Sequence, residues 1–213
     1  MFFKLPFFNS IRGDEAKPML ADNRGVLVQS ANSDLAHAAK SGKVFTGSAA
    51  AAGSVLPIFS NTAQVFGLWN PAGSGVDAFI TSIAASYVDT TGAAGGFVLG
   101  IVKNAGSATA TGAAVSAFTE GTPEPGIAGS RLGGNKVRFT PSAATVTAPS
   151  ILRHLGIGQL VLTASDATNG IFHFYRDFRG DLAIAPNTAV FLCGNIATLS
   201  KWAASITWVE EPV

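Results

Sequence analysis

The stretch from Val44 to Val102 constrains the fold most, because it carries only two formal charges, Asp77 and Asp89. It is rich in Gly, Ala, Ser and Thr, and its apolar runs are short and separated by Gly, Pro and Asn. This is the pattern of short strands joined by turns. Since a surface so poor in charge favours association over solvation, we expect sheet faces here that another copy or another protein covers.

Strand-like segments continue along the rest of the chain. The clearest is 201–209, where Trp202, Ala204, Ile206 and Trp208 alternate with smaller side chains, as in a half-buried strand. In 78–88 the expected alternation sets Phe79, Thr81 and Ile83 on one face. Further strands are predicted at 55–59, 64–69, 95–103, 137–139, 151–163 and 170–175. Residues 182–193 are predicted to form a strand, a turn at 185–188 and another strand.

Short strands at intervals of roughly 8 to 12 residues, without alternating long helices, indicate a sandwich or barrel rather than an α/β fold. We therefore predict an all-β protein, an antiparallel β-sandwich or a barrel. The segment 120–135 contains Pro123, Pro125 and several glycines, so it is predicted to be a long surface loop.

The first 43 residues have a different composition, with ten charged side chains and no sustained hydrophobic period. A short helix is predicted near 33–39, capped by Ser33 or Asn32. We expect an extended N-terminal arm over residues 1–43 and a β-sandwich domain over residues 44–213. Because exposed aromatic clusters favour binding, the arm's candidate partner contacts are its four phenylalanines: Phe2, Phe3, Phe7 and Phe8.

The charge balance argues against two classes of partner. Fourteen basic and 13 acidic residues give a net charge of +1, and aromatic and basic residues do not interleave on any predicted strand, so nucleic-acid binding is not expected. No run approaches the ~20 apolar residues that span a bilayer. We expect no nucleic-acid partner and no membrane partner.

No catalytic constellation stands out. His37, His154 and His173 are far apart and lack metal-site spacing. A triad can be assembled on paper from His173, Asp177 and a serine, but nothing marks the nucleophile. Asp166, Asp177 and Asp181 could supply the paired acids of an enzyme that cleaves cell-wall sugars, but nothing indicates that any two of them converge. We expect no enzyme, no cofactor and no metal.

Two glycine-containing motifs favour turns over binding loops. The segment 68–75 lacks the Lys and Ser or Thr of a phosphate loop, so its glycines are predicted to supply positive φ between paired strands, with Trp69 buried. Arg-Gly-Asp occurs at 12–14 and at 179–181, and the second copy is expected to close a hairpin between Phe174 and Leu182. Cys193, the single cysteine, is predicted to be a buried strand residue.

The motifs at 57–60, at 68–75 and at 189–212, which includes Trp202 and Trp208 to Glu210, resemble poorly characterised virion proteins of tailed bacteriophages and prophages. The resemblance covers roughly residues 43–213. It implies a small jelly-roll-like β-sandwich that serves as a trimeric capsid decoration (cement) protein or as another repeated component of the particle.

The sequence thus leads to the hypothesis of a phage virion structural protein, made in the host cytoplasm and located in the phage head. Its partners would be further copies of itself, as a homotrimer, and the major capsid protein, which the arm would clamp. The alternative is a tail-associated receptor- or glycan-binding module. In that case the loop at 120–135 and exposed faces of Trp69, Trp202 and Trp208 would bind the sugar.

Overall fold

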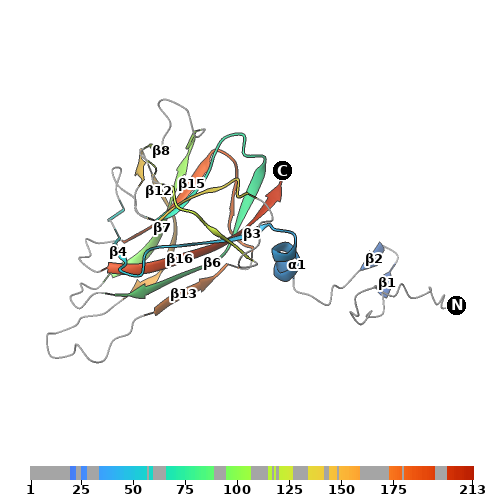
Figure 1. Ribbon diagram of the computed structural model, residues 1–213, viewed down its shortest axis with the longest axis horizontal. Coiled ribbons are helices and arrows are strands. Elements are labelled where there is room, and N and C mark those ends of the chain that lie inside the picture. Colours follow the sequence, from blue (N-terminus) through green and yellow to red (C-terminus); the bar gives the residue numbers. More distant parts are fainter. Residues whose placement is uncertain are drawn as a thin grey trace.

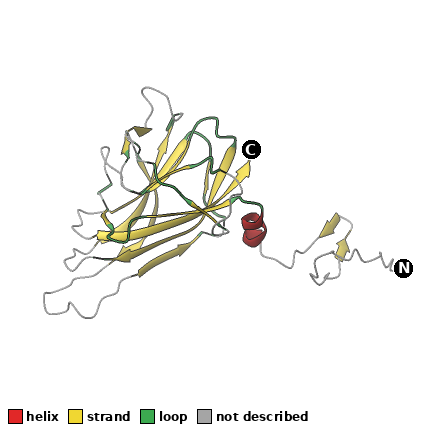
Figure 2. Cartoon of the chain, in the orientation of Figure 1, coloured by secondary structure: helices red, strands yellow, loops and turns green. Residues whose placement is uncertain are grey.

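A computed structural model gives the fold of the 213-residue chain. Apart from one short helix, the described residues form strands, turns and loops (Figures 1 and 2). The residues that the structure describes are 20–22, 25–27, 34–56, 58–59, 66–88, 95–106, 115–116, 118, 120–126, 134–141, 144–147, 149–158, 173–178, 180–194 and 201–213.

Two antiparallel sheets pack face to face and confirm the predicted β-sandwich (Figure 1). The five-stranded sheet has the order β10 (Arg138–Thr140), β5 (Gly67–Asn70), β15 (Thr188–Gly194), β7 (Gly95–Lys103) and β12 (Ser150–Gly158). The seven-stranded sheet has the order β13 (His173–Asp177), β6 (Val76–Tyr87), β16 (Lys201–Pro212), β3 (Val44–Ser48) and β9 (Glu124–Pro125), with β14 (Ala183–Ile184) also beside β6 and β4 (Ser54–Val55) also beside β16.

The pairing of the eight principal strands is nested. β3 pairs with β16, β5 with β15, β6 with β13 and β7 with β12, so that the first of these strands pairs with the last and the innermost two pair with each other. Alternate pairs belong to alternate sheets. This is the jelly-roll topology. It agrees with the sandwich that the strand pattern predicts and with the jelly-roll-like type that the resemblance implies.

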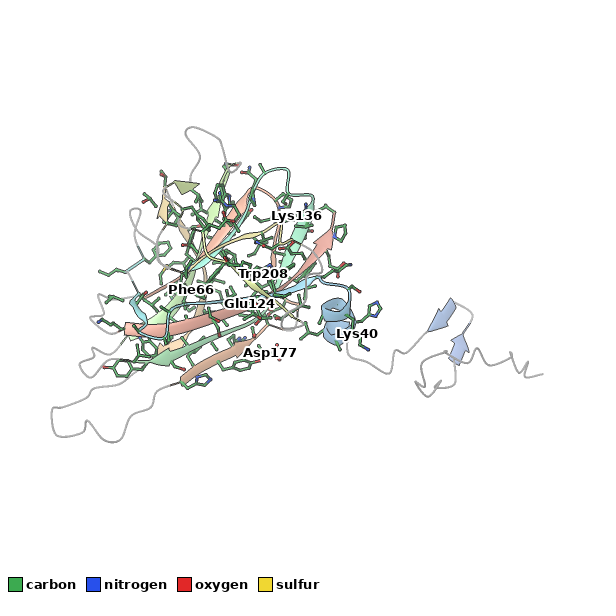
Figure 3. The ribbon with its side chains drawn as sticks, viewed as in Figure 1. Lys40, Phe66, Glu124, Lys136, Asp177 and Trp208 are labelled. Atoms are coloured by element: carbon green, nitrogen blue, oxygen red, sulfur yellow. The ribbon has the colours of Figure 1, made fainter. Side chains whose placement is uncertain are left out.

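The main core lies between the two sheets. Trp208, Phe66 and Phe139 are almost completely buried there, and the Phe66 and Phe139 rings meet edge to face with centroids 5.4 Å apart (Figure 3). Full burial of a Phe side chain stabilises a fold by about 1.5–3 kcal/mol. The alternation predicted for β16 is confirmed, since Trp202, Ala204, Ile206 and Trp208 all face this core.

A second apolar cluster covers the other face of the five-stranded sheet. Trp69, Phe191 and Cys193 belong to it, and the two-stranded sheet of β8 (Val115–Ser116) and β11 (Thr145–Val146) packs over them. This explains why β5, β7 and β15 are apolar on both faces. The expectation that a partner covers the charge-poor faces is therefore wrong for this face, which the chain covers itself.

The strict alternation predicted for 78–88 is also wrong. Ala78 and Ile80 face the core, but so do Ile83 and Ala85. Trp208 pairs with Ile80 while Thr207 pairs with Ser82, so Thr81 is an extra residue. Such a bulge switches the phase of the strand, and its position follows from the pairing with β16.

The corner after β5 confirms two predictions and corrects one. Trp69 is buried, and Gly73 and Gly75 have positive φ values of 79° and 73°. However, β5 and β6 are not paired with each other, because they lie in different sheets. The buried amide of Asn70 fixes this corner by donating to the carbonyls of Val76 and Ile184, each at 2.8 Å.

Two predicted connections differ in the structure. β13 and β14 do not form a hairpin, because both pair with β6 and follow one another along its edge, with Gly180 between them at φ 84°. Within the predicted loop 120–135, β9 pairs with β3, and Gly121 bridges to Phe139. Residues 127–133 lie outside the described part.

The N-terminal region contains more structure than an extended arm. β1 (Leu20–Asp22) and β2 (Gly25–Leu27) form an antiparallel pair, drawn beyond α1 in Figure 1. The predicted helix is confirmed as α1 (Asp34–Lys40), which ends at Gly42 with φ 72° and packs its buried Ala38 beside β3. The candidate contacts Phe2, Phe3, Phe7 and Phe8 lie outside the described residues.

Candidate interaction surface

The histidines singled out in the sequence lie on separate elements. His37 is on α1, His154 on β12 and His173 on β13, and all three are exposed. Among the residues that the structure describes, no group of three His, Cys, Asp or Glu side chains could hold a metal ion.

The triad assembled on paper is not brought together. His173 does meet a serine, since its Nδ1 lies 3.2 Å from the Ser86 hydroxyl across the β6–β13 pair. Asp177, however, lies four residues further along the same strand, which corresponds to about 13 Å. Of the other acids, Asp181 pairs with Arg153 at 2.8 Å, and Asp166 lies outside the described residues.

The tryptophans do not form a sugar-stacking platform. Relative exposure is 3% for Trp69, 7% for Trp202 and 0% for Trp208. Trp69 packs edge to face on Phe118, with ring centroids 5.4 Å apart, and its other neighbour is the Arg138 guanidinium, 4.9 Å from the ring centroid. No tryptophan therefore presents a free ring face to a glycan.

Cys193 and Glu210 are buried without serving as reactive groups. Burial raises the pKa of the Cys193 thiol from 9.0 to about 12, so it is a poor nucleophile at neutral pH. The Glu210 carboxylate accepts hydrogen bonds from the backbone N–H groups of Lys136 (2.8 Å) and Val137 (3.0 Å) and from the Trp208 indole (3.1 Å). Its role is to fix the segment before β10 to β16.

The seven-stranded sheet has one face turned away from the core, which we call the outer face. Its residues alternate with the core residues of β13, β6, β16 and β3. They are small and uncharged at the centre of the sheet, with the aromatic rings of Phe79 and Tyr175 to either side. The residues of this face are His173, Tyr175, Asp177, Phe79, Ser82, Ala84, Ser86, Ala203, Ser205, Thr207, Val209, Val44, Thr46 and Ser48.

Strand register arranges these residues in rows across the sheet. One row is Tyr175, Ala84, Ser205 and Ser48, and the next is Asp177, Ser82, Thr207 and Thr46. The hydroxyl oxygens of Thr46 and Thr207 are 3.1 Å apart, so these polar groups bond to each other. The centre of the outer face is consequently neutral, and some of its hydroxyl groups have hydrogen-bond partners within the sheet.

Charges lie at the two ends of the outer face. Lys201 is exposed where β16 begins. At the opposite end Asp77 is the register partner of Glu211, and the Lys43 ammonium is 2.6 Å from the Glu211 carboxylate. One end therefore carries a lysine and the other an excess carboxylate.

The two lateral margins of the outer face carry acids as well. Asp177 lies on β13, and Glu124, which pairs with Thr46, lies on β9; both are labelled in Figure 3. Near the acidic end, α1 lies against β3, whose Val44 is buried. Depletion of charge at the centre and a polar rim are features that protein–protein interfaces share.

Sequence reasoning missed the outer face because its rows join residues far apart in the chain, such as Thr46 and Thr207. One part of the signal was present, namely the small residues between the tryptophans in 201–209. Their positions relative to β6 and β3 required the strand order.

Comparison of the chain with protein-family models, curated proteins and solved structures gives no significant match. In the described part of the chain, no helix has the length and apolar character to cross a membrane. The likeness to phage virion proteins thus rests on the sequence motifs alone.

Proposed function

We propose that the chain is a structural subunit of a tailed-phage particle, a capsid decoration protein made in the host cytoplasm and carried on the phage head. The observation that carries this proposal is the outer face, which is neutral at its centre and charged at its rim. Such a surface suits a contact with other protein subunits.

The fold is compatible with this role. Jelly rolls form viral capsid domains and also lectins and cupins, so the topology agrees with a particle component without selecting it. The buried tryptophans weigh against the lectin-like use of the same fold, because none of their ring faces is free for a sugar.

The N-terminal arm, residues 1–43, supplies the proposed contact with the major capsid protein. Ordering a free arm costs about 1–2 kcal/mol per residue in backbone entropy. Burial of Phe2, Phe3, Phe7 and Phe8 returns about 1.5–3 kcal/mol each. This covers only part of the cost, so main-chain pairing and repetition over many sites contribute the rest.

Co-sedimentation with purified phage heads tests the arm. The full chain is compared with a variant in which Phe2, Phe3, Phe7 and Phe8 are all changed to Ser. Ile151→Ser, at an exposed position of β12 outside the arm, is the matched control. We expect the fourfold variant to lose affinity for heads by at least about tenfold, or about 1.4 kcal/mol, while its thermal unfolding matches that of the control. Equal binding of the two variants would refute the clamp.

A further inference from the structure

We infer that the outer face binds the same face of a second copy of this chain, across a two-fold axis that lies in the interface and runs perpendicular to the strands. This inference names the partner of the surface used in the proposed function and rests on that function. Its basis is the order of outward residues along β16, the central strand of the face: Lys201, Ala203, Ser205, Thr207, Val209 and Glu211.

That order is complementary to itself when reversed. With β16 laid antiparallel over its symmetry mate, Lys201 faces the partner's Glu211. In the same register Ala203 faces the partner's Val209, and Ser205 faces the partner's Thr207. Opposite charges meet at both ends, and small side chains meet in the middle, where two sheets stack about 10 Å apart.

The charges at the two ends match in sign and number. Lys201 has no ion pair within the described part of the chain, and the opposite end holds Asp77 and Glu211 against the single cation of Lys43. Each end of the dimer would therefore bring Lys201 opposite the partner's acidic pair of Asp77 and Glu211, which has only the one cation of Lys43 to balance it.

The lateral margin of β13 supports the same orientation. Asp177 faces the partner's Tyr175, whose hydroxyl can donate to the carboxylate. Tyr175 is 59% exposed in the single chain, the largest value for an aromatic residue in the described part. A second copy would cover it.

The other way of stacking two outer faces, with the axis along the strands, brings like charges together. Lys201 would face the partner's Lys201. Asp177 would face the partner's Glu124, because β13 and β9 flank the sheet and these two residues share one row. Juxtaposed like charges cost several kcal/mol at an interface, so the perpendicular axis is favoured.

The size of the outer face suits a small, specific contact. β6 and β16 have 12 residues each, β13 and β3 have five each and β9 has two. At about 4.8 by 3.3 Å per residue these strands cover roughly 570 Å². Complexes of standard size bury about 800 Å² per partner, and weaker ones bury less. A three-fold trimer, by contrast, joins two different patches of neighbouring copies, whereas the charges here complement the same patch.

Sedimentation equilibrium of the full chain at low and high salt tests the inference. We expect a dimer, with a Kd at least about tenfold weaker for Lys201→Glu and for Glu211→Lys, and a double variant K201E/E211K that binds more tightly than either single variant. The effect of each single change should shrink at high salt. Lys103→Glu, exposed on the five-stranded sheet, is the matched control.

A second change separates interface loss from misfolding. Ser205→Arg places a charge at the centre of the outer face and should give a monomer with unchanged circular dichroism. A monomeric or trimeric wild-type chain, or a double variant no tighter than the singles, would overturn the inference. If the chain forms dimers that fail to bind phage heads, only the proposed function is contradicted. If a monomer binds the heads, only the two-fold contact is contradicted.

Discussion

Glu210 illustrates what the sequence reveals at the scale of single residues. The alternation of Trp202, Ala204, Ile206 and Trp208 continues to Glu210, which is 6% exposed. A glutamate is rarely buried, and the predicted strand ends one residue earlier, at Val209. The pattern itself was present in the sequence, but the two backbone N–H groups that satisfy the carboxylate come from a segment more than 70 residues away.

Glu210→Gln should destabilise the fold although it preserves shape. The glutamine amide has one acceptor oxygen, and its NH₂ group would confront an N–H donor that the carboxylate now satisfies. We expect the free energy of unfolding to fall by about 1–3 kcal/mol, measured by urea denaturation. Glu124→Gln, at an exposed position of β9, should change it by less than about 0.5 kcal/mol; equal effects of the two changes would contradict this account.

Cys193 should be unreactive in the native protein. Since burial raises its pKa from 9.0 to about 12, a thiol reagent at pH 8 should label it slowly unless the chain is unfolded. The unfolded state ionises first as the pH rises, so stability is unaffected below about pH 9 and declines toward pH 12. Rapid labelling of the folded protein would show that the thiol is accessible. If a Cys193→Ala variant lost stability at alkaline pH as much as wild type does, ionisation of the thiol would not be coupled to folding.

At the scale of elements, the presence of a strand was easier to predict than which of its residues face the core. The predicted bounds of β7 and its two apolar faces are confirmed, because Phe97 and Leu99 face the main core and Val102 the second cluster. The phase of β6 was not predictable, since the extra residue Thr81 is defined only by the pairing with β16. The positive φ values at Gly73 and Gly75 were predictable, because they depend only on the local sequence of the turn.

Two glycines, Gly67 at the start of β5 and Gly73 in the corner after it, should respond differently to alanine. A Cβ at Gly67 would lie 2.2 Å from the Val190 carbonyl oxygen, so the backbone of β15 would have to move, at about 3 kcal/mol or more. A Cβ at Gly73 has open space and costs only the left-handed backbone, about 1–2 kcal/mol. The melting temperature of Gly67→Ala should therefore be lower than that of Gly73→Ala. The reverse order would contradict the packing described for β5.

At the scale of the whole molecule, the sandwich followed from the spacing of short strands, but the strand order did not. Nested pairing joins β3 to β16, which are more than 150 residues apart, and local patterns carry no record of such pairs. The shortage of charge between Val44 and Val102 now has two physical causes. One is the cover that β8 and β11 provide over the five-stranded sheet, and the other is the neutral outer face.

The central claim is that this chain is a repeated component of a phage head, and an averaged cryo-electron microscopy map of the particle tests it most directly. We predict many copies of the jelly roll on the outside of the head, with the N-terminal segment in contact with the major capsid protein. A few copies confined to the tail, or no copy on the particle at all, would contradict the account.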